Sequence, residues 1–230
     1  MFDLSLRFLL QLELGVIMRK TFIISFEGGE AVGKSTQVKK FVEYLKVKGI
    51  KYIHLREPGG TKMGEKLREI YIDKSYEVDT TTEILLMSTM RSKLCHEVLL
   101  PLIEKNENLV IVLDRFYHST FAYQHFGGGA DLKMVKTLIK YSTAGIKPDL
   151  TILLDQPAEI SHQRKVNEGK QDRFEMKGLD YYKTIENGYN TIAKKDKIIK
   201  KVKADQPIEK VHNDIIELFE KAYYKQKREV

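Results

Sequence analysis

Cysteine is nearly missing from this sequence of 230 residues, which contains only Cys95. A single cysteine excludes an intrachain disulfide and fits a reducing compartment, so we expect a cytoplasmic protein. The apolar neighbours Leu94 and Val98 predict a partly buried helical position for this thiol rather than a reactive one. The six histidines are scattered without the spacing of zinc ligands, so no protein-bound zinc is indicated.

Long hydrophobic runs are also missing. No stretch reaches the roughly 18 uninterrupted apolar residues of a membrane-spanning helix. Residues 1–16 are apolar but include Asp3 and Glu13 and lack the basic start of a signal peptide. Because Met18 stands just before the first predicted strand, we expect residues 1–17 to be a dispensable extension. An extra helix packed on the body is the alternative.

Positive charge exceeds negative charge, with a formal net charge of +7. Such a balance suits any anionic partner, including nucleic acid, a membrane or nucleotide phosphates. The lysines are spread along the chain, with one cluster over residues 194–203. No nucleic-acid-binding module is legible, and no aromatic-rich stacking motif accompanies the basic residues. We therefore expect phosphate-bearing small molecules as partners, and neither nucleic acid nor a membrane.

Five short runs of β-forming residues predict strands. They cover residues 21–27, 51–55, 109–113, 150–154 and 197–202. Continuous apolar runs such as 109–113 and 150–154 are typical of strands covered on both faces, as in parallel sheets.

Helical periodicity predicts the segments between these strands. They include residues 35–48, 64–72, 80–105 and a C-terminal stripe over 208–222, with residues 225–230 frayed. Pro101 predicts a kink or a restart within the longest of these helices. The alternation predicts one α/β domain over residues 18–230, a doubly wound parallel sheet of about five strands with helices on both faces.

A glycine-rich loop joins the first predicted strand to the first predicted helix. Residues 28–35, GGEAVGKS, match the pattern G-x-x-x-x-G-K-[ST] in full, and this context is that of a P-loop NTPase. The glycines let backbone N–H groups point at phosphate oxygens, Lys34 reaches the β- and γ-phosphates, and the Ser35 hydroxyl binds Mg²⁺. We expect ATP to contact the whole loop and the next residue: Gly28, Gly29, Glu30, Ala31, Val32, Gly33, Lys34, Ser35 and Thr36.

An acidic and a basic residue follow one another at the end of the third predicted strand. Asp114 occupies a Walker B-type position, which would hold Mg²⁺ directly or through water. Arg115 brings a cation to the carboxyl end of the sheet, where it can clamp an acceptor phosphate; a surface salt bridge is the alternative. No guanine-reading N-K-x-D sequence follows, and motors are usually longer chains. A kinase acting on a small acceptor fits best.

Several blocks occur in the order seen in one family. They are EGGEAVGKST (27–36), LREPGGTKMGEKLRE (55–69), LLMSTMRSK (85–93), DRFYHSTFAYQ (114–124) and PDLTILLD (148–155). Together they resemble bacterial thymidylate kinases over roughly residues 19–222. The resemblance implies transfer of the γ-phosphoryl group of ATP to dTMP for dTTP synthesis, with Mg²⁺. It also implies a homodimer. The helix over 80–105 could form the interface, but its apolar face would also serve as core.

The resemblance also implies roles for single residues. Glu30 would face the 3′-hydroxyl of the acceptor sugar, and Arg115 would clamp the acceptor phosphate. Arg91 would contact the thymine edge, and Thr120 would address the pyrimidine ring. Tyr123 would pack against the deoxyribose, where a 2′-hydroxyl would clash. These assignments predict an acceptor pocket on the carboxyl side of the sheet.

Other acceptor-side positions combine family features with departures from them. The loop over residues 57–61, which contains Pro58, would close over the acceptor. Met87 stands where the family commonly stacks a phenylalanine on thymine, and its polarizable sulfur can still lie against a ring. Phe116 replaces the usual tyrosine or histidine after the Asp-Arg pair. These departures concern base selectivity rather than the reaction type.

A polar segment, residues 163–177, stands where this family places a mobile lid. The variable positions of the P-loop carry no cation, so the charge on the transferring group must be met from elsewhere. Arg164 and Arg173 are the candidates, although other positions where such lids often have arginine read Val166 and Glu168. Two further lid residues match acidic residues at the acceptor and at the metal, respectively: Asp172 and Glu175.

Two other readings stay open at this stage. One is a different P-loop kinase, acting on a deoxynucleoside or on another nucleotide, which an acceptor panel would distinguish. The other is not an enzyme but an ATP-binding regulator or a nucleic-acid-associated ATPase, which the basic charge suggests. Hydrolysis stimulated by DNA, without phosphorylation of an acceptor, would favour that second reading.

Overall fold

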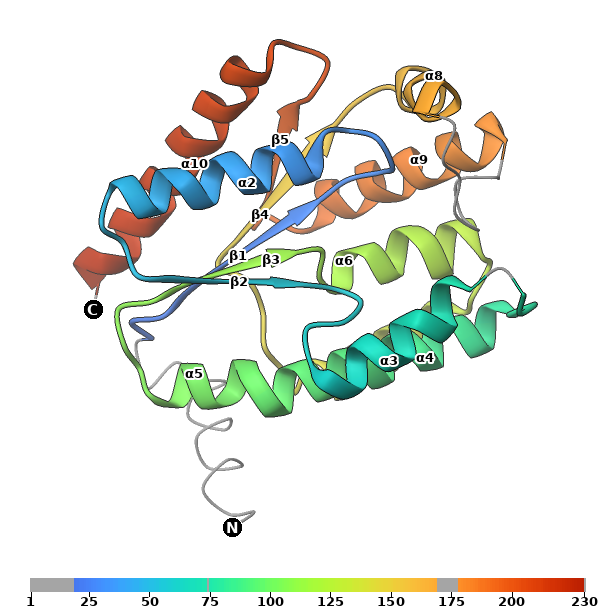
Figure 1. Ribbon diagram of the computed structural model, residues 1–230, viewed down its shortest axis with the longest axis horizontal. Coiled ribbons are helices and arrows are strands. Elements are labelled where there is room, and N and C mark those ends of the chain that lie inside the picture. Colours follow the sequence, from blue (N-terminus) through green and yellow to red (C-terminus); the bar gives the residue numbers. More distant parts are fainter. Residues whose placement is uncertain (1–18, 74, 169–177, 230) are drawn as a thin grey trace.

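A single sheet of five parallel strands organises the computed structural model, which describes residues 19–73, 75–168 and 178–229. The strand order is β2-β3-β1-β4-β5 (Figure 1). Their bounds are β1 Phe22–Glu27, β2 Tyr52–Arg56, β3 Val110–Asp114, β4 Leu150–Asp155 and β5 Ile199–Lys203. All five predicted strands are confirmed. The central strand β1 pairs with β3 on one side and β4 on the other, as in a doubly wound sheet.

Helices cover both faces of this sheet. Their bounds are α2 Lys34–Val47, α3 Lys62–Ile72, α4 Thr80–Leu94, η1 Cys95–Leu99, α5 Leu100–Glu104, α6 Tyr117–Thr120, η2 Phe121–Gly127, α7 Leu132–Ser142, α8 Ala158–Glu168, α9 Leu179–Lys195 and α10 Ile208–Glu229. Helices α2 and α10 lie on one face, and α4, α5 and α6 lie on the other (Figure 1). On the face covered by α2 and α10, the rings of Phe41 and Phe219 pack edge to face with their centroids 4.9 Å apart, within the hydrophobic core.

The long helix predicted over residues 80–105 is continuous but changes its hydrogen bonding. The α-helix α4 leads into one π-helical turn, η1, and then into α5, which begins one residue before Pro101. Proline has no N–H to donate to the carbonyl four residues back and crowds it, and the widened turn lies where this conflict arises. Cys95 opens that turn and is fully buried, and burial raises the pKa of its thiol. The thiol is thus in a helix as predicted but more deeply buried than predicted, and this burial disfavours the thiolate that a reactive cysteine needs.

Strand β5 forms one edge of the sheet and carries part of the lysine cluster. Ile199 and Val202 are buried, while Lys200, Lys201 and Lys203 are exposed. Lysines on an edge strand discourage pairing with another chain. Much of the cluster seen in the sequence thus has an explanation that needs no nucleic acid.

The C-terminal helix differs from the prediction of a frayed end, which is wrong. Helix α10 continues through Glu229 because its last turns are held by the two residues that lead into the segment before β1, Arg19 and Lys20. Gln226 Nε2 donates to the carbonyl of Arg19 at 2.8 Å, and Lys227 Nζ donates to the carbonyl of Lys20 at 3.1 Å.

The N-terminal residues and the search for membrane-spanning helices concern the chain as a whole. The extension expected over residues 1–17 lies outside the described residues, so its boundary stays a prediction. Among the helices in the described part of the chain, none has the length and apolar character needed to cross a membrane.

Candidate active site

The glycine-rich loop lies between β1 and α2, as the motif predicts. Ala31 and Gly33 adopt left-handed backbone conformations, with φ values of 53° and 85°, which curl the loop. A cavity on its outer side is lined by residues 29–37 together with Arg164 and Lys165 of α8. This cavity, the donor cavity below, contains every predicted ATP-contacting residue except Gly28.

Gly28 has a different task from the other loop residues. A Cβ atom there would lie 2.9 Å from the carbonyl oxygen of Leu154, so only glycine lets the loop approach β4 this closely. Its own carbonyl accepts a hydrogen bond from Arg115 Nη1 at 2.7 Å.

Lys34 points at the end of β3. Its Nζ lies 2.5 Å from Asp114 Oδ1 in an ion pair that is mostly buried. Burial and the nearby Arg115 lower the pKa of Lys34, while Asp114 opposes this change. The P-loop lysine and the Walker B-type aspartate, 80 residues apart in the chain, are thus brought together.

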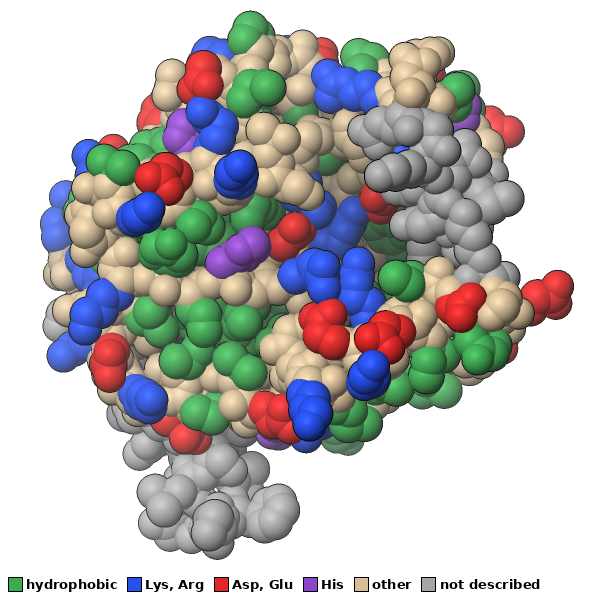
Figure 2. Space-filling view, viewed as in Figure 1, with side chains coloured by type: hydrophobic (Ala, Val, Ile, Leu, Met, Phe, Trp, Pro, Cys, Tyr) green, Lys and Arg blue, Asp and Glu red, His purple; other side chains and the backbone are tan. Residues whose placement is uncertain are grey.

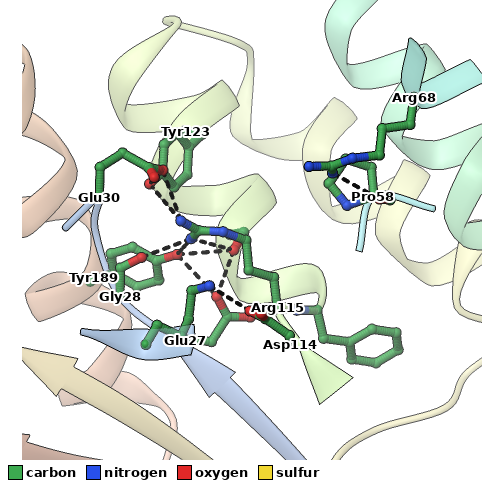
Figure 3. Close-up of polar contacts among 12 residues, drawn as sticks. Glu27, Gly28, Glu30, Pro58, Arg68, Asp114, Arg115, Tyr123 and Tyr189 are labelled. Carbon is green, nitrogen blue, oxygen red and sulfur yellow. Dashed lines mark hydrogen bonds and ion pairs between the residues drawn. The ribbon is translucent and has the colours of Figure 1, made fainter. Parts of the chain in front are cut away.

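Arg115 lies at the centre of the site, with its guanidinium directed at the P-loop (Figure 3). Nη2 donates to Glu30 Oε1 at 2.8 Å and to the Tyr123 hydroxyl at 3.2 Å, and Nη1 donates to the Tyr189 hydroxyl at 3.1 Å. The residue has a left-handed backbone, φ 68°, which is costly for a non-glycine residue and recurs at functional sites. This arginine is held by the interior rather than free at the surface, which removes the surface salt bridge as its explanation.

Glu30 stands between this arginine and the P-loop lysine. The Tyr123 hydroxyl donates to its Oε1 at 2.6 Å, on the same oxygen that pairs with Arg115. Burial acts to raise the pKa of Glu30, but Arg115, the Tyr123 hydrogen bond and Lys34 outweigh it and hold the pKa below its ordinary value. Glu30 is therefore an ionised acceptor at neutral pH.

A second cavity opens on the other side of the same residues, towards α3 and α4. Its lining supplies four cations: Lys34, Arg56, Arg68 and Arg115. Figure 2 shows lysine and arginine side chains gathered at a hollow of the face in view. Pro58, Met87 and Tyr123 line it as well, as predicted for the acceptor pocket. We call it the acceptor cavity. Four residues line both cavities and form the wall between them: Glu30, Lys34, Ser35 and Arg115.

Comparison with known proteins agrees with this geometry. The family described as thymidylate kinase matches residues 26–215. The thymidylate kinase of Kosmotoga olearia is 40% identical over 197 residues, which cover 85% of this chain and 94% of that protein. The thymidylate kinase of Thermoanaerobacter sp. strain X514 is 39% identical over 199 residues, covering 86% and 97%. The chain belongs to the thymidylate kinase family.

Two residues predicted to read the base in this thymidylate kinase family member lie behind the cavity wall. Arg91 is 1% exposed, and its Nη1 donates to Thr120 Oγ1 at 2.9 Å. Its Nη2 lies 2.7 Å from Glu57 Oε2, in an ion pair that is also buried. Neither Arg91 nor Thr120 is among the lining residues, so their contact with thymine stays a prediction.

The lid is only partly within the described residues. Its first part, residues 163–168, continues helix α8. Arg164 Nη1 lies 3.4 Å from the carbonyl of Ala31 in the P-loop, so this candidate reaches the donor cavity. The other predicted lid residues lie outside the described residues: Asp172, Arg173 and Glu175.

Sequence reasoning missed four residues of this thymidylate kinase site. Gln124 and Arg68 line the acceptor cavity; each lies within a block that carried the resemblance, so a signal was present. Glu27 is fully buried beneath Arg115, and Tyr189 reaches the same place from α9. Glu27 opens the first quoted block, whereas nothing in the sequence near Tyr189 marked it.

Proposed function

We propose that the protein transfers the γ-phosphoryl group of ATP to dTMP, giving ADP and dTDP. The observation that carries the proposal is the common wall of the donor and acceptor cavities, where Glu30, Lys34, Ser35 and Arg115 face both sides. Two nucleotides in these cavities would place their phosphates on either side of this wall. Membership in the thymidylate kinase family supports dTMP rather than another nucleotide as the acceptor, and a regulator would leave the acceptor cavity without a use.

The residues in the wall divide the work of transfer. Phosphoryl transfer passes through a loose transition state, so the protein mainly positions groups and neutralises charge. Lys34 follows charge on the β- and γ-phosphates, and Arg115 holds the acceptor phosphate in line. Glu30, ionised and between the two cavities, accepts a hydrogen bond from the sugar hydroxyl of the acceptor.

The residues present fit Mg²⁺ as the accompanying metal. Ser35 and Asp114 both line the acceptor cavity beside the P-loop, and their hydroxyl and carboxylate oxygens are the hard ligands that Mg²⁺ prefers. The described residues hold no group of three or more His, Cys, Asp or Glu suited to a metal, and Mg²⁺ commonly takes its other ligands from nucleotide phosphates and water. When bound, Mg²⁺ neutralises charge on the β- and γ-phosphates. Glu175 is proposed as a further ligand from the sequence alone.

Helix α8 supplies the cation that the variable positions of the P-loop lack. Arg164 reaches the carbonyl of Ala31 and lines the donor cavity beside Lys165. We assign Arg164 to the charge on the transferring group, because water-excluding closure makes a cation there effective. Arg173 and Asp172 keep the catalytic and acceptor roles that the resemblance implies.

An amide side chain at the acceptor cavity favours a pyrimidine base that carries a ring N–H. Gln124 is 1% exposed and lines the cavity, and its Oε1 has no hydrogen-bond partner within the described residues. A buried carbonyl oxygen without a partner is costly, so a donor from the base would be favoured. Thymine offers N3–H at this edge, whereas the N3 atom of cytosine is an acceptor.

A panel of acceptors tests the proposal. ADP release is measured with ATP and dTMP, dUMP, CMP, UMP or AMP, and with thymidine as the unphosphorylated control. We expect dTMP to give the highest kcat/KM, dUMP to follow and CMP to fail. Activity on thymidine without activity on dTMP would replace the proposal with a nucleoside kinase, and DNA-stimulated hydrolysis alone would replace it with an ATPase.

Tyr123 is expected to select deoxyribose over ribose. The ring is 9% exposed, lies 5.1 Å from the Arg115 guanidinium and lines the acceptor cavity, where it leaves little room for a 2′-hydroxyl. An unpaired buried hydroxyl costs about 1–3 kcal/mol, so preference for dTMP over ribothymidine monophosphate should be roughly tenfold to a hundredfold. In Tyr123→Ala, kcat/KM for the two substrates should converge through a gain on the ribonucleotide.

The control for this prediction is Tyr123→Phe. It keeps the ring but loses the hydroxyl that donates to Glu30 at 2.6 Å. Selectivity should therefore survive in Tyr123→Phe while activity on both nucleotides falls. An unchanged selectivity ratio in Tyr123→Ala would mean that the ring only packs.

We further propose a homodimer working in the cytoplasm. Large apolar side chains are exposed on three neighbouring helices, with α4 packed against both α3 and α7: Ile70, Ile72, Leu85, Leu132 and Tyr141. Covering such side chains favours association. The free Cys95 suits a reducing compartment. Sedimentation velocity should give about twice the chain mass of 26.7 kDa.

A further inference from the structure

Glu27, the last residue of β1, is a fully buried carboxylate that the mechanism above leaves without a task. Its Oε1 accepts a hydrogen bond from the backbone N–H of Phe116 at 2.7 Å. Its Oε2 accepts from Ser119 Oγ at 2.6 Å and from the Tyr189 hydroxyl at 3.0 Å. Three donors from two distant segments thus converge on one carboxylate directly beneath Arg115 (Figure 3).

The chemistry of these groups sets the direction of each hydrogen bond. An ionised carboxylate only accepts, and each hydroxyl has a single proton to give. Glu27 takes the protons of both Ser119 and Tyr189, so the lone pairs of the two oxygens are left for other donors. Burial and the Glu27 carboxylate raise the pKa of Tyr189, so its phenol keeps the proton that it donates.

Those lone pairs face the guanidinium. Arg115 Nη1 donates to the Tyr189 hydroxyl at 3.1 Å and lies 3.4 Å from Ser119 Oγ. The bond from Phe116 to Glu27 also fixes the backbone directly after the left-handed conformation of Arg115. The same buried carboxylate therefore holds both the backbone next to the arginine and, through the two hydroxyls, its side chain.

We propose that Glu27 is a positioning residue, which acts through Tyr189 and Ser119 to aim the Arg115 guanidinium at the phosphate of the acceptor nucleotide. The proposal rests on the proposed function, in which Arg115 holds that phosphate. Glu27 touches neither substrate. It makes two neutral hydroxyls into acceptors, so the arginine keeps one direction whether or not its bond to Glu30 is exchanged for a phosphate.

Glu27→Gln tests the polarity of the network with almost no change in shape. The amide places an N–H₂ donor near the hydroxyls, whose protons must then turn towards Arg115 and repel its own N–H groups. We expect the KM for dTMP to rise about tenfold or more, and the KM for ATP to stay within about twofold, because the arginine that Glu27 orients is proposed to hold the phosphate of dTMP and not those of ATP.

Tyr189→Phe is the milder second variant, which keeps the test decisive if Glu27→Gln folds poorly. It removes one acceptor from Arg115 and one donor from Glu27, so the KM for dTMP should rise about threefold to tenfold. The matched control is Asp149→Asn. Asp149 is a partly buried carboxylate near the other end of β1, with 24% of its side chain exposed, and it accepts from the Ile23 N–H at 2.7 Å. Its loss should lower stability without a selective change in the KM for dTMP.

Combination with Arg115→Met separates positioning from a structural role. If Glu27 acts through Arg115, Glu27→Gln should cause little further loss of dTMP affinity, measured by calorimetry, in the Arg115→Met background. Equal losses in both backgrounds, or an unchanged KM for dTMP in Glu27→Gln and Tyr189→Phe, would overturn the inference while the kinase assignment stands. A parent protein that phosphorylates no dTMP would refute the proposed function and this inference with it.

Discussion

Replacing Lys34 with alanine is expected to lower kcat for dTMP phosphorylation by about a thousandfold or more, which corresponds to roughly 4 kcal/mol of lost transition-state stabilisation. The Lys34 ammonium is the P-loop cation that follows charge onto the leaving phosphate. The KM values for ATP and dTMP should change little by comparison, because the contact between Lys34 and the phosphates strengthens as the transition state forms. Steady-state kinetics with saturating ATP measure the change.

The fold should survive this substitution. Lys34 pairs with Asp114 at 2.5 Å, but burial and Arg115 already act against its charge, so its removal relieves a repulsion as it breaks an attraction. Lys40→Ala is the matched control on the same helix, since its ammonium pairs with Glu209 at the surface, at 2.8 Å. Near-normal kcat in Lys34→Ala would remove the assignment of the loop as the ATP site.

The second large effect concerns stability rather than rate. Arg91→Met should reduce the free energy of unfolding by about 3–5 kcal/mol, because it leaves Glu57 as a buried charge without its partner. The two residues are 1% and 4% exposed, and their side chains share two short contacts. Urea unfolding followed by circular dichroism gives the value. Arg56→Met breaks an arginine–glutamate pair of similar length at the surface, between Arg56 and Glu65, and should change stability by less than about 1 kcal/mol.

The pH dependence of the Arg91→Met defect has a definite sign. Burial raises the pKa of Glu57 above its ordinary value of 4.5, and Arg91 opposes this rise. Without Arg91 the folded-state pKa rises further, so the folded protein binds a proton that the unfolded chain releases above about pH 4.5. The stability of Arg91→Met relative to the parent should therefore fall as the pH rises from about 4.5 to the raised folded-state pKa of Glu57. It should recover as the pH is lowered again.

A double variant separates the charge from the packing. Glu57→Gln added to Arg91→Met removes the buried charge and should restore part of the lost stability. If Arg91→Met shows the same defect at pH 6 and pH 8, or if the double variant is less stable than the single one, the loss arises from the guanidinium packing instead.

The local parts of this molecule could be predicted from the sequence because local rules determine them. Runs of β-forming residues predicted all five strands, and the P-loop motif predicted the phosphate-binding loop beside the donor cavity. Contacts between distant segments could not be predicted in this way. Glu57 and Arg91 are 34 residues apart, and Glu27 and Tyr189 are 162 residues apart. No spacing rule links such pairs, since only the packed sheet brings them together.

The acceptor side shows a second limit of sequence reasoning. The resemblance named Arg91 and Thr120 as base-reading residues, yet both are enclosed behind the wall, and the amide that lines the cavity is that of Gln124. A motif identifies which residues gather at a site, but the packed fold decides which of them line the cavity. The end of α10 is a further example. Its polar sequence predicted a frayed tail, but the hydrogen bond from Gln226 to the carbonyl of Arg19 holds it in the helix.

The docking of α10 on the start of the domain also determines where the protein can be handled. The C-terminal end of this helix lies beside Arg19 and Lys20, on the side of the sheet where the strands begin (Figure 1). Both nucleotide cavities are instead lined by residues at the carboxyl ends of the strands. A purification tag, a fluorescent reporter or a solid support joined at this end would thus stand away from the entrances used by nucleotides. The catalytic face would remain accessible on an immobilised enzyme, and a fused reporter would sense the body of the domain rather than the substrates.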